Sequence, residues 1–258
     1  MENKEYLEFA KEIAYEAGKI MLKYFNAKDI SSYKGDKTIV TLADKEINTY
    51  LINRVKEKFP DHCVDGEEEK FGNSNYVWVC DPIDGTAMYA RHIPVAVFSL
   101  ALVVDGESKV GVVYDVFTDT LYSAIKGEGA YKNGEKISVN IYKLEDMRSV
   151  SNYDMWPEAE YKIYDIIKEI GNKTYFVSIG SVIRGAMCVA SGEFNLAIFP
   201  GTKRKNWGDC RNVRTPQEGF QRYQYKQLLS KLQKCRFNLY ECQQWQKRND
   251  SGKNRNNP

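Results

Sequence analysis

Apolar residues in the first sixty positions recur with the three- and four-residue spacing of amphipathic helices. One such pattern runs over residues 5–25, with lysine and glutamate on its polar side. A second pattern begins just after Thr41 and ends before Pro60. We therefore predict two surface helices that pack on a core, joined by a polar loop over residues 28–39.

A series of short β-branched and aromatic runs follows and predicts strands. The runs cover residues 76–80, 95–104, 110–116 and 121–126. The pairs Asp105-Gly106 and Asn133-Gly134 mark turns, and the second pair is typical of a tight hairpin. These runs predict an antiparallel meander whose last, short strand covers residues 136–139.

Beyond about residue 140, helical and strand patterns alternate. They predict a helix over 157–170, a strand over 173–179, a helix over 181–190 and a strand over 194–199. Alternating helices and strands form layers, because each element hides its apolar face against the next one. We therefore predict an α+β fold, with residues 1–140 as its first half and residues 141–207 as its second half.

Formal charge divides the chain near Lys205. The residues from Lys205 onward include 12 basic and 4 acidic side chains, whereas the preceding residues include 25 basic and 31 acidic ones. All eight glutamines also lie in this final stretch. The net charge of +2 thus combines two unlike compositions, and we treat residues 208–258 as a separate basic, glutamine-rich tail.

The six cysteines show neither paired CxxC spacing nor a neighbouring histidine cluster, so the sequence does not predict a zinc site. The charged start of the chain leads into an amphipathic segment, which predicts neither a signal peptide nor a membrane span. We therefore expect a reduced, cytoplasmic setting. We expect the two histidines, His62 and His92, to be ordinary surface or loop residues.

The stretch Asp81-Pro82-Ile83-Asp84-Gly85-Thr86 follows the first apolar strand run and carries the strongest chemical signal. Proline fixes one backbone angle and restricts the residue before it, so the two carboxylates are offered to one region. Oxygen ligands of this kind suit Mg²⁺. Gly85-Thr86 is expected to open a helix whose free amides hold a phosphate. The alternative is that this aspartate-rich stretch is only a turn.

This motif, with Gly66-Glu67-Glu68 upstream, resembles the signature of the inositol monophosphatase family of Mg²⁺-dependent phosphomonoesterases. The resemblance extends from Lys34-Gly35-Asp36 and residues 40–44 to Gly180-Ser181 and residues 187–192, and it ends near Trp207. It implies a layered αβαβα sandwich with two or three Mg²⁺ ions between its halves. It also implies a small phosphate ester as substrate, of the inositol monophosphate or fructose-1,6-bisphosphate class, and allows a homodimer.

The resemblance also implies roles for individual residues. The implied metal ligands are Glu67, Asp81, the carbonyl of Ile83, Asp84 and Asp209. The implied phosphate- or substrate-binding residues are Asp84, Gly85, Thr86, Gly180 and Ser181. Glu67 would also act as a base near the attacking water, which Asp44 and Thr86 would orient. Asp84 would bridge toward a second metal ion.

Some of these acidic residues have plain structural explanations as well. Asp44 falls in the first turn of the second predicted helix, where an acidic side chain favours the helix dipole. Glu68 and Glu69 fit a solvated acidic loop equally well, so we assign a metal role to Glu67 alone.

The resemblance fails in the tail. The family has Trp-Asp-Ile-Ala-Ala-Gly here, whereas this chain has Trp207-Gly208-Asp209, so the aspartate comes one residue late. We hypothesise that an inserted nucleotide shifted the reading frame at Gly208, which predicts an incomplete second half, a weak second metal site and low activity. The alternatives are a natural disordered extension and a basic, aromatic tail that binds nucleic acid on a relic of the fold.

Overall fold

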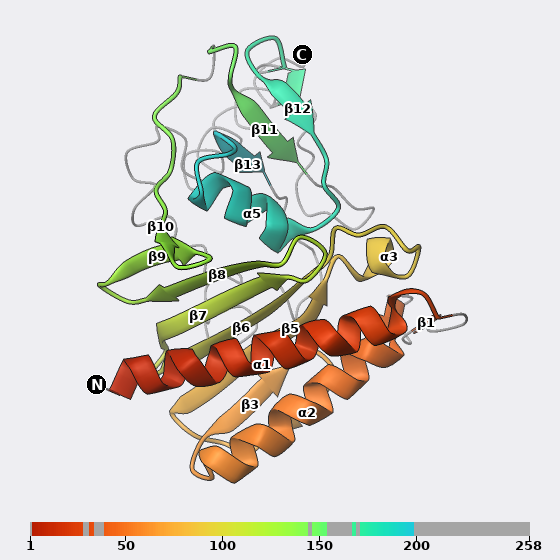
Figure 1. Ribbon diagram of the computed structural model, residues 1–258, viewed down its shortest axis with the longest axis vertical. Coiled ribbons are helices and arrows are strands. Elements are labelled where there is room, and N and C mark those ends of the chain that lie inside the picture. Colours follow the sequence, from red (N-terminus) through yellow and green to blue (C-terminus); the bar gives the residue numbers. More distant parts are fainter. Residues whose placement is uncertain are drawn as a thin grey trace, which may run out of the picture.

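The computed structural model describes residues 2–27, 31–33, 39–143, 146–153, 167–168 and 171–198, with the backbone alone for 31–33, 39 and 40. The helices labelled in Figure 1 are α1 (Glu2–Phe25), α2 (Leu42–Lys58), α3 (Thr86–Tyr89) and α5 (Val182–Ala190). The first strands are β1 (Ser31–Tyr33), β2 (Ile39–Thr41), β3 (Cys63–Gly66), β4 (Lys70–Phe71), β5 (Tyr76–Asp84) and β6 (Val97–Val104). The others are β7 (Glu107–Asp115), β8 (Thr120–Ile125), β9 (Gly129–Lys132), β10 (Glu135–Lys136), β11 (Val150–Tyr153), β12 (Tyr175–Val177) and β13 (Leu196–Ile198).

The two predicted surface helices are confirmed as α1 and α2, which lie side by side on one face of a large sheet (Figure 1). Their apolar stripes meet the sheet because buried residues recur every three or four positions along each helix. Phe9 and Ile13 of α1 and Leu51 of α2 are fully buried against strand residues such as Trp78. This cluster is the main core of the protein.

The predicted meander is confirmed within an eight-stranded sheet of order β10-β9-β8-β7-β6-β5-β3-β4. Every neighbouring pair is antiparallel except β3 and β5, which run parallel. The hairpin between β9 and β10 turns at Asn133 and Gly134, whose φ angles are 48° and 85°. Positive φ at both positions is what a tight hairpin turn requires, which explains the Asn-Gly pair.

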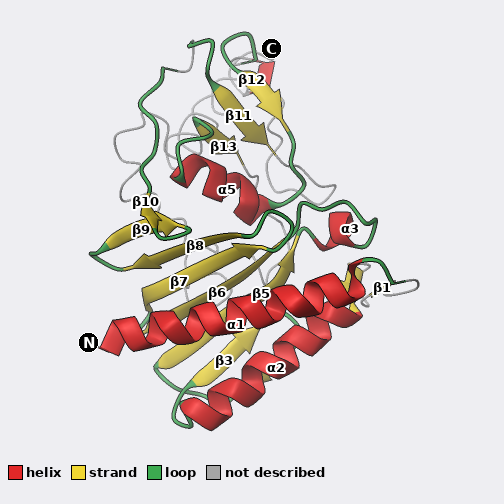
Figure 2. Ribbon diagram, viewed as in Figure 1, coloured by secondary structure: helices red, strands yellow, loops and turns green. Residues whose placement is uncertain are grey.

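Helix α5 covers the opposite face of the large sheet from α1 and α2. Its Ile183 and Met187 pack against Val79, Ala101 and Val113, whose side chains point to that face. A three-stranded parallel sheet of order β12-β11-β13 lies beyond α5 (Figure 2). The described residues thus form helix, sheet, helix and sheet layers in turn, which confirms the predicted layered α+β class.

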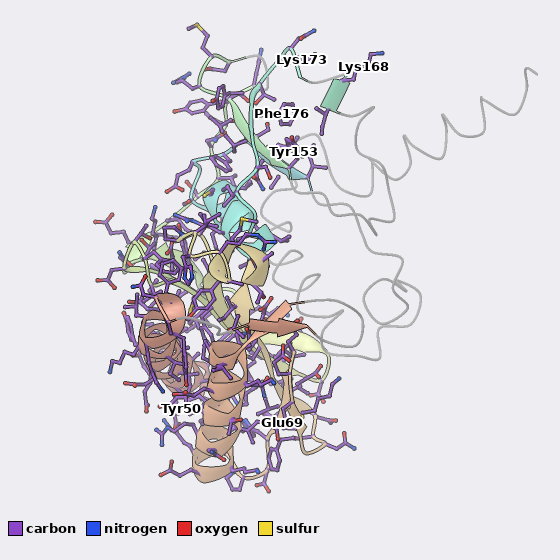
Figure 3. All side chains as sticks on the ribbon, turned by 90° about the vertical axis from the view of Figure 1, so that its right-hand side faces the viewer. Tyr50, Glu69, Tyr153, Lys168, Lys173 and Phe176 are labelled. Atoms are coloured by element: carbon purple, nitrogen blue, oxygen red, sulfur yellow. The ribbon has the colours of Figure 1, made fainter. Side chains whose placement is uncertain are left out.

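The three-stranded sheet has a small apolar cluster of its own. Tyr153 of β11 and Phe176 of β12 meet edge to face, with ring centroids 5.8 Å apart (Figure 3). Ile167, Leu196 and Ile198 complete the cluster. The boundary near residue 140 stays a prediction, and the tail over 208–258 lies outside the described residues.

The structure differs from the sequence prediction at several element boundaries. The expected loop over 28–39 contributes β1 and the start of β2, and the strand expected over 136–139 is only the short β10. Strand β3 was not predicted, because the two apolar residues in Cys63–Gly66 are too few to show a strand period. Of the helix predicted over 157–170, only residues 167–168 are described, and they are helical.

His62 was expected to be a surface or loop residue; it lies in the loop between α2 and β3 but not at the surface. His62 is only 9% exposed and stacks between Phe59 and Tyr76, with ring centroids 4.8 and 4.7 Å away. The indole N–H of Trp78 donates to its Nδ1 at 3.1 Å. Burial lowers the pKa of His62, which keeps the ring neutral as that hydrogen bond requires. His92 is exposed, as expected.

Candidate active site

The Asp81–Thr86 motif lies where β5 crosses the large sheet and turns into α3. The structure extends β5 through the motif to Asp84, beyond the expected strand end. Asp81 pairs with Ser99 and Asp84 with Val97, and the register shifts between these two pairs. Pro82 lies inside the shift because it has no N–H to give to a ladder. The irregularity places two carboxylates at one point of the sheet.

Gly85 makes the sharp turn from β5 into α3, with φ at 94°. A β-carbon there would lie 3.1 Å from the carbonyl oxygen of Gly180 and 3.2 Å from Cβ of Ser181. Helix α3 is a single turn, shorter than the helix expected at Gly85-Thr86. The Thr86 hydroxyl donates to the Ile83 carbonyl at 2.8 Å, which fixes both groups across the turn between β5 and α3.

Asp84 reaches across to the start of α5. The Ser181 hydroxyl and the backbone N–H of Ile183 both donate to its Oδ2, the latter at 2.8 Å. Ser181 also caps α5, since its hydroxyl oxygen accepts the N–H of Arg184 at 3.1 Å. The structure therefore brings Asp84, Gly85, Gly180 and Ser181 together, and their role in binding a substrate stays a prediction.

Asp44 closes the N-terminal turn of α2 with Thr41. Its Oδ2 accepts the N–H and the hydroxyl of Thr41, each at 2.7 Å, so Asp44 lies in the first helical turn as expected and also forms a capping box there. Its other oxygen, Oδ1, is buried without a hydrogen-bond partner. Burial raises the pKa of Asp44 to about 7, against the hydrogen bonds from Thr41 and with help from the charges of Glu67 and Glu68.

Glu67 follows directly on β3, one strand away from the motif. Its backbone N–H donates to the carbonyl of Cys80 at 3.2 Å, which sets Glu67 beside the residue that precedes Asp81. Glu67 and Glu68 are half-buried and Glu69 is exposed. The acidic stretch is therefore not simply a solvated loop.

Negative charge accumulates around Asp81. Burial raises its pKa well above the usual range, and the charges of Glu67, Asp84 and Asp44 raise it further. The pKa of the neighbouring Cys80 thiol is also raised, first by burial and then by Asp81 and Glu67. Four carboxylates thus act on one another, and a bound cation would relieve their repulsion.

The donor atoms of these residues fit a hard cation such as Mg²⁺. Oδ1 of Asp81, like Oδ1 of Asp44, is buried and accepts no hydrogen bond from the protein. All the donors are oxygens, as Mg²⁺ prefers. Within the described ranges, no group of three or more His, Cys, Asp or Glu side chains forms a site that could hold a metal ion by itself, so the ligand set stays a prediction. Asp209, the fifth expected ligand, lies outside the described residues, as does Lys34-Gly35-Asp36.

Arg184 is a residue that the sequence analysis missed. It lies on α5 three positions after Ser181, and its Nη2 atom lies 3.1 Å from Oδ2 of the buried Asp115. Its Nη1 donates to the carbonyl of Pro94 at 3.3 Å. No local pattern pointed to this pair, because its partners come from β7 and from the segment after α3.

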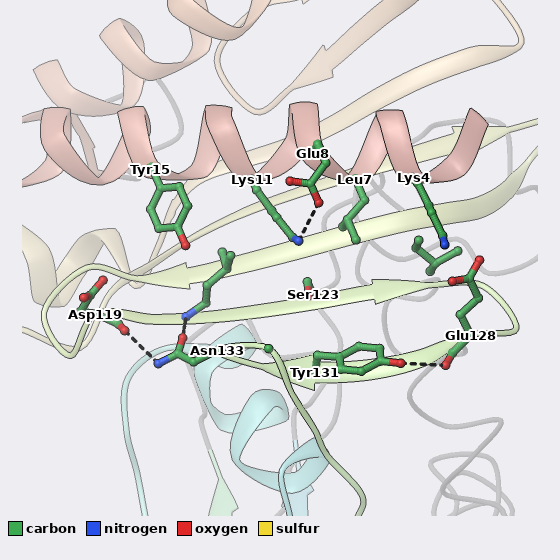
Figure 4. A pocket seen from close by; sticks show the side chains of 13 residues that line it. Lys4, Leu7, Glu8, Lys11, Tyr15, Asp119, Ser123, Glu128, Tyr131 and Asn133 are labelled. Carbon is green, nitrogen blue, oxygen red and sulfur yellow. Dashed lines mark hydrogen bonds and ion pairs between the residues drawn. The ribbon is translucent and has the colours of Figure 1, made fainter. Parts of the chain in front are cut away.

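A surface cavity of about 690 Å³ lies elsewhere, between α1 and strands β8 and β9 (Figure 4). Lys11 and Tyr15 of α1 face Asn133 and Tyr131 across it. None of the candidate site residues lines this cavity. The candidate site at the carboxylates around Asp81 is therefore separate from this cavity. No helix in the described part of the chain is long and apolar enough to cross a membrane.

Sequence comparison connects this chain to phosphatases. The sequence model described as "Inositol monophosphatase family" matches residues 2–210. A fructose-1,6-bisphosphatase/inositol-1-monophosphatase of Aquifex aeolicus (strain VF5) is 36% identical over 209 residues, which cover 78% of this chain and 77% of that protein. Inositol monophosphatase 3 of Solanum lycopersicum is 33% identical over 142 residues, 53% of each chain. The chain thus spans about half the length of several curated relatives that it matches.

Solved structures of the same kind share the fold. An inositol monophosphatase of Thermotoga maritima matches with a TM-score of 0.68 at 27% identity, over 76% of each chain. A protein described as an IMPase/NADP phosphatase complexed with Mg²⁺ and phosphate matches with a TM-score of 0.67 at 24% identity, over 79% of this chain and 77% of that one. At that identity, the second match supports the fold alone.

Proposed function

Because the chain belongs to the inositol monophosphatase family, we propose that it hydrolyses a phosphate monoester of a small polyol or sugar with the help of Mg²⁺. The observation that carries the proposal is the group of mutually repelling carboxylates around Asp81, two of which have a buried oxygen that accepts no hydrogen bond from the protein.

Glu67, Asp81 and the carbonyl of Ile83 would hold the first Mg²⁺ ion. Asp84 would face a second ion, and the family resemblance adds Asp209 to that site. When bound, Mg²⁺ supplies positive charge that polarises the phosphoryl group and lowers the pKa of a coordinated water. The protein contributes oxygen ligands held by the β5 irregularity and by α5.

Asp44 and Thr86 would orient the attacking water. Oδ1 of Asp44 accepts no hydrogen bond from the protein, so it can accept one from a water molecule. Thr41 holds the other oxygen of Asp44 with two hydrogen bonds of 2.7 Å, which fixes the direction of the carboxylate. The Thr86 hydroxyl donates to Ile83 and therefore offers its oxygen as an acceptor. Orientation of this kind lowers the entropic cost of in-line attack.

The substrate would lie near Gly85, Thr86, Gly180 and Ser181. Support comes from the close approach of the Gly85 and Gly180 turns and from the amides at the start of α3. The name of the Aquifex aeolicus relative favours inositol 1-phosphate and fructose 1,6-bisphosphate as the first candidates. We further propose a homodimer on the family resemblance and a reduced, cytoplasmic setting on the pattern of cysteines.

A panel of phosphate esters tests this proposal. We would measure release of inorganic phosphate from inositol 1-phosphate, fructose 1,6-bisphosphate and a nucleotide 3′-phosphate, with Mg²⁺ and with EDTA. The full chain would be compared with a variant whose residues from Gly208 onward are replaced by the matching segment of the Aquifex aeolicus relative. Mg²⁺-dependent turnover by the replaced variant supports the proposal, and no turnover by either form contradicts it.

A further inference from the structure

Helix α2 carries a second polar residue on its buried face, one turn after Asp44. This residue is Asn48, which is fully buried although Ile47 and Leu51 around it are apolar. Residues four apart lie on the same face of a helix, so Asn48 and Asp44 point toward the same part of the molecule. A buried amide is costly unless its donor and acceptor atoms are used.

The Asn48 amide binds the segment that carries Glu67. Its Nδ2 donates to the carbonyl of Glu69 at 3.0 Å. Its Oδ1 accepts the backbone N–H groups of Glu68 and Glu69, both at a longer 3.4 Å. One side chain thus contacts the backbone on both sides of Glu68.

Gly66, at the other side of Glu67, makes room for the same amide. A β-carbon at Gly66 would lie 1.9 Å from Oδ1 of Asn48 and 2.6 Å from its Cγ. Such a contact is impossible unless the Asn48 side chain, the helix or the turn moves. Gly66 is therefore needed here for close approach to Asn48.

These contacts fix the turn that carries Glu67. The N–H of Gly66 closes the turn by donating to the carbonyl of Glu69 at 3.1 Å, and the N–H of Glu67 is tied to Cys80 of β5. Asn48 adds three hydrogen bonds from α2 to this turn. The turn is thereby held between α2, which carries Asp44, and β5, which carries Asp81.

We propose that Asn48 is a positioning residue that fixes the Gly66–Glu69 turn against α2 and so directs the Glu67 carboxylate toward the metal site. The role of Glu67 as a metal ligand rests on the proposed function. The hydrogen bonds by which Asn48 fixes the turn do not depend on it. A side chain that orients a metal ligand typically changes metal affinity by 10- to 100-fold when it is removed.

Two measurements on the full chain test this role. Asn48→Ala removes all three hydrogen bonds, so hydrogen exchange of the Glu68 and Glu69 amides should rise by about tenfold or more as the turn opens locally. Mg²⁺ affinity, measured by calorimetry, should fall by about 10- to 100-fold. The matched control is Val55→Ala, which also truncates a fully buried side chain of α2, but one whose apolar side chain makes no hydrogen bond to the turn. The control should lose thermal stability and keep both the exchange rates and the Mg²⁺ affinity.

An isosteric variant separates positioning from packing. Asn48→Asp keeps the shape of the side chain but sets an oxygen against the Glu69 carbonyl, where Nδ2 now donates at 3.0 Å. It should therefore behave like Asn48→Ala in both measurements. Gly66→Ala should also weaken Mg²⁺ binding, and much less so in an Asn48→Ala background, where the added β-carbon finds space.

The outcomes distinguish the two claims. If the wild-type chain binds Mg²⁺ and Asn48→Ala binds it equally well with unchanged exchange at Glu68 and Glu69, the positioning role is overturned. If the wild-type chain binds no Mg²⁺, the proposed function fails, and exchange at the two amides still decides whether Asn48 holds the turn. Additive effects of Gly66→Ala and Asn48→Ala would also contradict the contact on which the inference depends.

Discussion

Replacing Arg184 with methionine should loosen α5 from the large sheet. The methionine keeps most of the apolar stem of arginine and removes only the guanidinium group. That group joins α5 to Asp115 at the end of β7 and to the carbonyl of Pro94. The same helix offers the Ser181 hydroxyl and the Ile183 N–H to Asp84, so α5 and the motif are linked.

The size of the effect follows from the burial of the pair. The Asp115 side chain is 4% exposed and that of Arg184 is 24% exposed, so the variant leaves a buried carboxylate without its cation. Breaking a fully buried pair costs about 3–5 kcal/mol. Asp115 keeps the N–H groups of Phe117 and Thr118 at 3.0 and 3.3 Å, and the arginine is partly solvated. We therefore expect a loss of about 2 kcal/mol in the free energy of unfolding.

Thermal melting followed by circular dichroism measures this loss. For a chain of this size, about 2 kcal/mol corresponds to a drop in Tm of roughly 4–8 °C. The double variant Arg184→Met/Asp115→Asn should be clearly less destabilised than the sum of the single variants, because it no longer buries an unpaired charge. A drop below about 1 °C for Arg184→Met, or strictly additive effects in the double variant, would refute the reasoning.

Three further predictions concern the site and the core. Asp84→Asn should remove at least about 99% of the Mg²⁺-dependent phosphatase activity, because it takes a ligand charge away at constant volume. The measurement is phosphate release, and activity within about twofold of wild type would count against a metal role for Asp84. Gly85→Ala should lower the free energy of unfolding by about 1–3 kcal/mol, because φ of Gly85 is 94° and the new methyl group would crowd Gly180. Denaturant titration measures this loss, and an unchanged denaturation midpoint would contradict the prediction. Burial lowers the pKa of His62 below its ordinary 6.5 in the folded state, so the stability from its neutral ring is present above pH 6.5 and lost as the pH falls below it. Tm should therefore fall more steeply from pH 7 to pH 5 in the wild type than in His62→Phe. Parallel profiles of Tm against pH in the two proteins would contradict this prediction.

Local sequence patterns predicted the elements that depend on local periodicity. The buried apolar positions of α1 repeat at helical spacing, and the Asn133-Gly134 pair is a strong local signal for a tight turn. The Asp81–Thr86 motif could likewise be located, because its residues are neighbours in the chain. Even there, the extension of β5 to Asp84 was missed, since strand pairing across Pro82 depends on Val97 of another strand.

Long-range contacts could not be predicted in this way. The burial of the loop residue His62 was missed because it depends on Phe59, Tyr76 and Trp78, which meet only in the folded chain. The hydrogen bond from Ser181 to Asp84 joins residues that are 97 positions apart in the sequence, so no local pattern could predict it. Asn48 did leave a local signal, a polar residue on an apolar helical face four positions after Asp44, but only the structure shows its partners.

Calorimetric titration of the full chain with Mg²⁺, compared with the same titration of Asp81→Asn, tests the central claim most directly. Burial and the charges of Glu67, Asp84 and Asp44 all raise the pKa of Asp81. Its Oδ1 is buried without a hydrogen-bond partner in the protein. The account predicts saturable Mg²⁺ binding by the wild-type chain and at least about tenfold weaker binding by a folded Asp81→Asn variant. Equal Mg²⁺ affinity in the two proteins would contradict it.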